Sequence, residues 1–113
     1  MKTSDTELLI KAIDNYDILT PSHRKVLKIL VELCIDDQLI TTTIKLSKIS
    51  GFSRTLIYQA LEVFKHLEFI EITTKDKNQL NAVVLKFHKL NDIIKHYELE
   101  QETKKKYRNV KNT

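Results

Sequence analysis

The fold is decided by residues 43–70, TIKLSKISGFSRTLIYQALEVFKHLEFI. Leu46 and Ile49 predict an apolar stripe on a short first helix, and Gly51 supplies a tight turn after it. Ser53 stands where the N-cap of a second helix is expected. The stretch therefore predicts two helices joined by a turn, and the second helix leads directly into a strand.

The second helix of this stretch has an apolar face and a polar face. Four apolar residues follow the helical spacing i, i+3, i+4 and i+7 and are expected to face the core: Ile57, Ala60, Leu61 and Phe64. The opposite face is expected to stay exposed, and it carries donors and acceptors suited to phosphates and base edges: Arg54, Thr55, Tyr58, Gln59 and Glu62.

Two β-rich runs follow the second helix. Residues 69–73 and residues 82–88 predict strands, and the polar residues 75–81 join them. Residues 39–41, which precede the helix pair, predict a short strand that pairs with these two. Two strands joined by a charged loop directly after a helix pair form a wing.

With these features the segment resembles the winged helix-turn-helix proteins of bacteria and archaea, the broad class that includes MarR-like and GntR-like regulators. The resemblance covers residues 20–89 and rests on these positions: Phe52, Ser53, Arg54, Thr55, Ile57, Ala60, Leu61, Phe64 and Ile70. Glu68 stands where the class usually has glycine, and Leu56 stands where it often has threonine. The resemblance implies a mainly α fold with a small antiparallel β wing, and double-stranded DNA as the partner.

Residues 21–35 predict the first helix of the winged domain. Thr20 suits the cap of this helix and Pro21 its first position, and the two aspartates at 36–37 are expected to end it. Cys34 lies on the apolar face of this helix with no adjacent base. It therefore predicts a buried, inert thiol in preference to an oxidation sensor.

Helices are expected on both sides of the winged domain, residues 20–89. Residues 1–19 contain a predicted helix from 6 to 19, and residues 90–113 contain a helix to about residue 105 and a basic tail. The C-terminal helix has an apolar stripe but no evident partner inside a compact winged core. In related winged proteins such helices pack across a two-fold axis. A homodimer through both terminal helices is therefore expected, and folding back onto their own domain is the alternative.

DNA contacts are expected from the helix pair and the wing. The expected readers of base edges are Arg54, Tyr58 and Gln59. The expected phosphate ligands are Lys48, Ser53 and Thr55. The wing tip is expected to grip the flanking backbone or minor groove through Lys75, Lys77, Asn78 and Gln79, and a solvated turn is the alternative. Further phosphate contacts are offered by His23, Arg24 and Lys25.

The net charge of the chain is +4, and the basic excess lies on the helix pair. Residues 41–67 carry four lysine or arginine residues against one acid, whereas residues 1–20 are net acidic. A local basic excess is the electrostatic signature of nucleic-acid binding. The C-terminal tail adds further cations, which either track phosphates or stay solvated.

No catalytic residue, metal ligand or cofactor is expected. Gly51 alone cannot form a phosphate-cradling loop, and no nucleophile stands in a recognisable elbow. The four histidines show no His-x-x-x-His spacing and the chain has no Cys-x-x-Cys motif. No apolar run is long enough for a membrane span and no signal peptide is evident, so a cytoplasmic protein is expected.

The function predicted from the sequence is sequence-specific binding of double-stranded DNA by a small dimeric transcriptional regulator. Two alternatives stay open. One is a plasmid or phage replication or partition protein that coats repeated sites. The other is a winged module that uses its exposed face for a protein partner.

Overall fold

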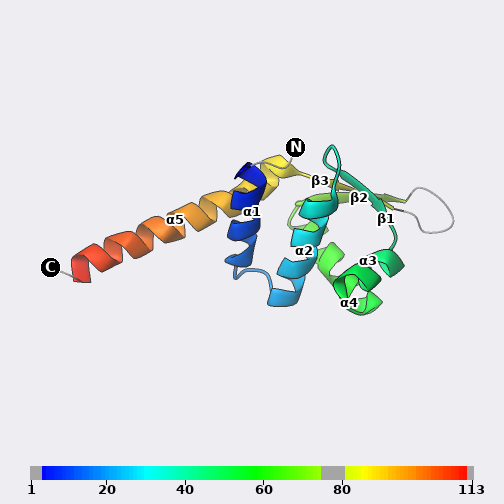
Figure 1. Ribbon diagram of the computed structural model, residues 1–113, viewed down its shortest axis with the longest axis horizontal. Coiled ribbons are helices and arrows are strands. Elements are labelled where there is room, and N and C mark those ends of the chain that lie inside the picture. Colours follow the sequence, from blue (N-terminus) through cyan, green and yellow to red (C-terminus); the bar gives the residue numbers. More distant parts are fainter. Residues whose placement is uncertain (1–3, 75–80, 112–113) are drawn as a thin grey trace.

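The computed structural model describes residues 4–74 and 81–111. In chain order the elements are α1 (Ser4–Asp14), α2 (Pro21–Leu33), β1 (Gln38–Thr41), α3 (Thr43–Ser50), α4 (Arg54–His66), β2 (Ile70–Thr74), β3 (Asn81–Leu85) and α5 (Phe87–Lys111) (Figure 1). The structure is mainly helical with a small antiparallel sheet, which confirms the predicted fold class. None of the described helices is both long and apolar enough to cross a bilayer.

Threonine side chains start two of the helices, and the cap at Thr20 was predicted. The Thr20 hydroxyl accepts a hydrogen bond from the backbone N–H of His23 at 3.2 Å, and Pro21 occupies the first turn of α2. The Thr42 hydroxyl accepts from the N–H of Lys45 at 3.1 Å at the start of α3. These bonds satisfy N–H groups that a helix start otherwise leaves without partners.

The sheet has the strand order β1-β3-β2, and both pairings are antiparallel. Val83 lies in the central strand, opposite Leu39 of β1 and Ile72 of β2. The prediction that residues 39–41 form a strand paired with the wing is therefore confirmed.

Strand β3 is shorter than predicted. The expected strand ran over residues 82–88, but β3 ends at Leu85. The N–H of Lys86 donates to the carbonyl oxygen of Phe69 at 2.8 Å, and the carbonyl oxygen of Lys86 accepts from the N–H of Leu90 at 2.9 Å. The backbone of Lys86 is therefore hydrogen-bonded both to the segment that leads into β2 and to the first turn of α5. Helix α5 begins at Phe87 and ends at Lys111, so it begins earlier and runs further than predicted.

Helix α2 ends at Leu33, before the two aspartates that were expected to end it. Asp36 and Asp37 both have left-handed φ, 52° and 65°. They form a tight turn in which Ile35 and Gln38 exchange backbone hydrogen bonds of 2.8 and 3.0 Å. Aspartate tolerates left-handed φ better than most residues, so the pair forms a hairpin turn.

Helix α1 also ends before its predicted end at residue 19. It stops at Asp14, and the N–H of Asn15 turns back to the carbonyl oxygen of Ala12 at 3.1 Å. Leu19, in the connection to α2, is nevertheless buried in the core.

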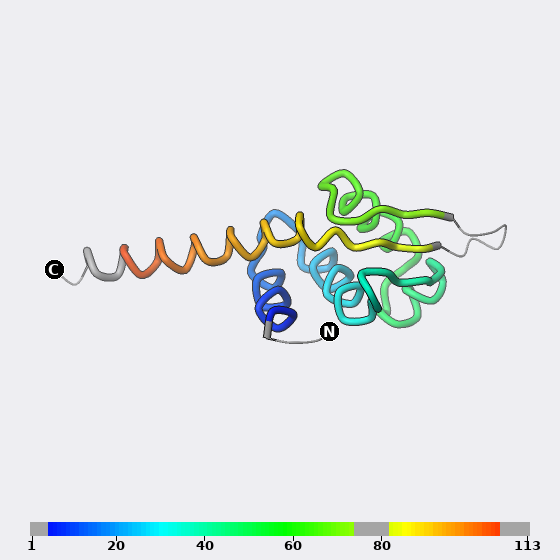
Figure 2. Tube along the Cα trace, turned by 90° about the horizontal axis from the view of Figure 1, so that it is seen from above, coloured from blue at the N-terminus to red at the C-terminus, as the bar shows by residue number. Residues whose placement is uncertain are grey.

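The hydrophobic core lies between α2, α4 and the sheet, and α1 and the first turns of α5 complete it. Figure 2 shows α1 beside the first turns of α5. Leu90 and Ile93 have no exposed surface. The apolar stripe at the start of α5 thus has a partner within its own chain, helix α1, which is the alternative in which the terminal helices fold back. Beyond this contact α5 extends away from the other elements, so the molecule measures 63 × 28 × 22 Å (Figure 1).

Helix α4 ends in a turn that places Glu68 in the left-handed region, with φ 65°. The N–H of Glu68 donates to the carbonyl oxygen of Lys65, and the N–H of Phe69 donates to that of Phe64 at 2.9 Å. This is the Schellman arrangement, in which glycine usually occupies the place that Glu68 holds. The backbone of Glu68 is therefore strained in this turn, because a left-handed φ is unfavourable for a residue with a Cβ atom.

We expect Glu68→Gly to raise the free energy of unfolding by about 0.5–1 kcal/mol. Relief of the left-handed strain outweighs the extra chain entropy that glycine brings to the unfolded state. Urea denaturation measures the change. Glu68→Ala is the matched control, because it removes the same carboxylate but keeps the Cβ atom. Equal effects of the two substitutions would show that φ is not the cause.

Candidate nucleic-acid interface

The turn between α3 and α4 is fixed by its own hydrogen bonds. Gly51 has φ 79°, and its N–H donates to the carbonyl oxygen of Ser47 at 2.9 Å, which ends α3. Ser53 is the N-cap of α4, and its hydroxyl accepts from the N–H of Leu56 at 3.1 Å. The two helices are thus joined by residues 51–53, with the glycine and the cap in the places that the sequence predicts.

Phe52, the middle residue of the turn, is anchored from several sides. Its carbonyl oxygen accepts from the Ser47 hydroxyl, and its N–H donates to the Ser50 hydroxyl at 3.1 Å. The ammonium group of Lys25 lies 5.2 Å from the centre of the Phe52 ring, within the range of a cation–π interaction. These contacts hold α4 in a fixed orientation relative to α3 and α2.

Helix α4 divides into the two predicted faces. Ile57 and Phe64 have no exposed surface, and Ala60 and Leu61 are buried beside them. The residues of the other face are all exposed: Arg54, Thr55, Tyr58, Gln59 and Glu62. They fall at i, i+4 and i+8, or next to such positions, so they share one side of the helix.

Helix α3 presents only part of the apolar stripe expected of it. Leu46 is buried, but Ile49 is 54% exposed, so its predicted place in the stripe was wrong. The helix has only eight residues, and Leu46 lies on the side that faces the core. Lys45 and Lys48 are exposed on α3.

Charges on the exposed face are mostly positive. Lys48 and Arg54 are exposed beside the turn. Glu62, the one acid on the outer face of α4, lies 3.1 Å from the ammonium group of Lys65. This ion pair reduces the repulsion that an unpaired carboxylate would exert on phosphates.

The three cationic or polar residues at the start of α2 are committed to contacts within the chain. The His23 ring lies edge-on to Phe64, with ring centres 6.4 Å apart. The guanidinium of Arg24 donates to the carbonyl oxygen of Asp14 at 2.7 Å. Lys25 lies over Phe52. Their predicted phosphate contacts would have to compete with these interactions.

The predicted wing-tip residues Lys75, Lys77, Asn78 and Gln79 lie outside the described residues. Strands β2 and β3, which lead to them, end at the paired residues Thr74 and Asn81. In Figures 1 and 2 this end of the sheet points away from the C-terminal end of α5.

The burial of Cys34 and the proximity of three acidic and histidine side chains differ from what the sequence suggests. Cys34 is only partly buried, and its thiol donates to the carbonyl oxygen of Val31 at 3.3 Å. Asp17, His96 and Glu100 come together although no motif was recognised among them. The overlooked signal was the spacing His96-x-x-x-Glu100, which places both side chains on one side of a helix.

The α3–turn–α4 unit, preceded by α2 and β1 and followed by the β2–β3 pair, defines a winged helix-turn-helix fold with a helix added at each end.

A solved structure with this arrangement is described as a "Possible transcriptional regulator from Methanosarcina mazei Go1". The two structures superpose with a TM-score of 0.60 over 90% of this chain and 85% of that chain, at 12% sequence identity. By sequence, the chain matches no protein-family model and no curated protein. The structural likeness therefore establishes the fold.

Proposed function

We propose that this protein binds duplex DNA sequence-specifically through α4 and acts as a cytoplasmic transcriptional regulator without catalytic activity. The observation that carries the proposal is the outer face of α4, which is polar and exposed along its length while its inner face is fully buried. The inner face of α4 packs into the core and leaves the outer face accessible. The major groove is wide enough to admit an α-helix, so α4 can lie in it with its outer face toward the bases.

Six exposed side chains of the helix pair have a role in this proposal, and the wing tip adds four more. The guanidinium of Arg54 matches the O6 and N7 acceptors of guanine, and the amide of Gln59 matches N6 and N7 of adenine. Tyr58 meets a base or phosphate through its ring or hydroxyl. Backbone phosphates are held by Lys48, Ser53 and Thr55. The flanking backbone or minor groove is gripped by the wing-tip residues Lys75, Lys77, Asn78 and Gln79.

The likeness to the Methanosarcina mazei protein supports the regulatory part of the proposal, since that protein is described as a possible transcriptional regulator. The alternatives of a replication or partition protein and of a protein-binding module are distinguished by the sites that the protein selects, as set out in the Discussion.

A homodimer is part of the same proposal, with the distal half of α5 as its contact. The apolar stripe at the start of α5 is already covered by α1, but residues 101–106 are exposed. Leu99 is 63% exposed on this extension. Isolated helical segments of this length are marginal in water, so a partner would stabilise it.

The charges of the extension support an antiparallel pair related by a two-fold axis. Three glutamates, at 98, 100 and 102, precede three lysines at 104–106. In an antiparallel pair the acidic part of one helix lies beside the basic part of the other, which a self-complementary interface requires. Such a dimer would present two copies of α4 to half-sites about one helical turn apart.

We expect the protein to elute as a dimer of twice 13.3 kDa and Leu99→Lys to shift it toward the monomer. A charged side chain within the contact cannot be buried without a partner. Size-exclusion chromatography with light scattering measures the masses. Ile35→Lys, which adds the same charge at a residue that is 77% exposed on the hairpin turn, serves as the control. A dimer unaffected by Leu99→Lys would place the interface elsewhere.

We expect Lys48→Ala to weaken binding to all duplex sequences to a similar extent and to reduce the slope of log K against log salt by about 1. With one phosphate contact fewer, DNA binding releases about one counterion fewer. Fluorescence anisotropy over a salt series measures both effects.

Lys11→Ala is the control for this salt series, because it removes the same charge from an exposed site on α1. It should leave the slope unchanged. Equal changes in the two variants would indicate that only net charge matters, and binding to DNA without any salt dependence would contradict the proposal.

A further inference from the structure

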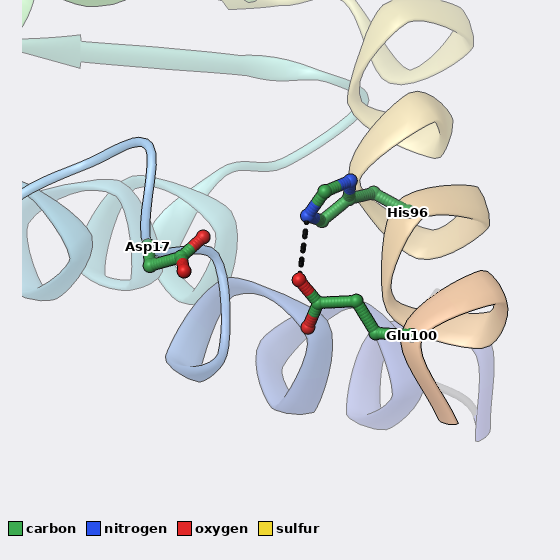
Figure 3. A group of neighbouring side chains, drawn as sticks. All are labelled: Asp17, His96 and Glu100. Atoms are coloured by element: carbon green, nitrogen blue, oxygen red, sulfur yellow. Dashed lines mark ion pairs between the residues drawn. The ribbon is translucent and has the colours of Figure 1, made fainter. Parts of the chain in front are cut away.

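Three residues from distant parts of the chain form a group on the side of the molecule where α1, its connection to α2, and α5 meet. Asp17 comes from the connection between α1 and α2, and His96 and Glu100 lie one turn apart on α5 (Figure 3). One nitrogen or oxygen atom from each residue lies within 4.8 Å of the corresponding atoms of the other two. Three potential ligand atoms at such separations can share one metal ion.

The imidazole of His96 is held in place by packing. Its ring lies edge-on to the ring of Tyr16, with centres 5.5 Å apart and an interplanar angle of 89°. Tyr16 in turn packs edge-on against Phe69 at 6.3 Å. The packing of Tyr16 and Phe69 thus orients the His96 imidazole before any ligand binds. This order lowers the entropic cost of binding.

The nitrogen of His96 that faces this group lacks a hydrogen bond. Its Nε2 atom is shielded from solvent and has no hydrogen-bond partner among the described residues. Glu100 Oε1 lies 2.9 Å from Nε2 and forms an ion pair with the imidazole when the ring is protonated (Figure 3), although the two atoms make no hydrogen bond. Nε2 therefore has one carboxylate beside it and no hydrogen bond, so a ligand in this group could contact both atoms.

Negative charge surrounds the histidine. Asp17 and Glu100 bring two carboxylates to the group, and Asp92 lies one turn before His96 on the same side of α5. A cation placed among these groups would meet a favourable potential.

We propose that Asp17, His96 and Glu100 bind a divalent first-row transition metal ion, with Zn²⁺ as the preferred occupant. One imidazole nitrogen and two carboxylate oxygens are a ligand set that zinc accepts, and water completes the tetrahedron. Mg²⁺ and Ca²⁺ favour sites built from oxygen alone. The ion would tie the α1–α2 connection to α5 and fix the direction in which α5 leaves the domain. This inference does not depend on the proposed DNA binding.

Isothermal titration calorimetry of the full-length, metal-free protein with ZnCl₂ near neutral pH tests the proposal. We expect one Zn²⁺ per chain and a rise in the melting temperature on adding Zn²⁺. Asp17→Asn, His96→Gln and Glu100→Gln should each lower the affinity by about tenfold or more, since second-shell changes alone cost 10–100-fold. The same substitutions should abolish most of the thermal shift.

His88→Gln and Glu98→Gln are the matched controls, because both replace exposed residues of α5 outside the group. They should bind Zn²⁺ as the unaltered protein does. Absence of saturable binding at micromolar Zn²⁺ would overturn the proposal. Binding that survives all three substitutions would also overturn it, because another site would then hold the ion. Asp17 is exposed, so Asp17→Asn stays informative even if His96→Gln disturbs folding. The titration contains no DNA, so its failure would leave the proposed function standing.

Discussion

Replacing Arg54 with alanine is expected to weaken binding to the cognate duplex by about 1–3 kcal/mol and to relax the sequence preference at one base pair. The guanidinium is exposed at the start of α4, in the first turn after the Ser53 cap. A bidentate contact with guanine is lost only where that guanine is present, so the loss on random duplex should be smaller. Gln59→Ala should act in the same way at a different base pair.

Arg54→Lys separates base reading from charge. Lysine keeps the positive charge but lacks the planar fork of the guanidinium. We therefore expect Arg54→Lys to retain affinity for random duplex and to lose discrimination among cognate variants. Competition binding with duplexes changed at single positions measures both quantities. Equal losses on cognate and random duplex for Arg54→Ala and Gln59→Ala would remove these residues from the role of base readers.

The second large effect concerns stability. Phe64→Ala is expected to lower the free energy of unfolding by about 3–5 kcal/mol. The Phe64 side chain has no exposed surface and meets the edge of the His23 ring at 6.4 Å between centres. A domain of this size is typically stable by about 5–15 kcal/mol, so the variant would lose a large share of its stability. Urea denaturation measures the change.

Tyr58→Ala is the matched control for Phe64→Ala. It removes an aromatic side chain of nearly the same size from the same helix, but Tyr58 is 53% exposed on the opposite face. Its effect on stability should stay within about 0.5 kcal/mol. Comparable losses in the two variants would mean that α4 does not bury one face and expose the other.

Features governed by local chemistry could be predicted from the sequence. Thr20, Thr42 and Ser53 cap helices because a hydroxyl in that place satisfies an N–H group within three residues. Gly51 marks the turn because its φ of 79° favours a residue without Cβ. The two faces of α4 follow from helical periodicity alone.

Features governed by contacts between distant segments were predicted less well. The aspartates at 36–37 form a hairpin turn instead of ending a helix, because the chain must reverse after α2 to enter β1, which pairs with β3. The stripe containing Leu90 and Ile93 is covered by α1, a pairing that periodicity cannot reveal. Ile49 is exposed because the buried face of α3 is formed by Thr43, Leu46 and Ser50, and Ile49 lies beside that face.

The candidate sites also differ in whether local sequence or contacts between distant segments determine them. The residues on α3 and α4 could be chosen from the sequence, because they lie on one exposed face of a predicted helix. The group formed by Asp17, His96 and Glu100 could not, because it depends on how α5 crosses the α1–α2 connection. Only the His96–Glu100 spacing carried a local signal.

Selection of fragmented host DNA by the purified protein at about 150 mM salt, with sequencing of the retained fragments, tests the central claim most directly. The proposal predicts enrichment of a few sites, each with two half-sites about one helical turn apart, and loss of that enrichment in the Arg54→Ala, Gln59→Ala double variant. Tandem copies of one short site would instead favour a replication or partition protein. Retention of no particular sequence would contradict sequence-specific binding through α4.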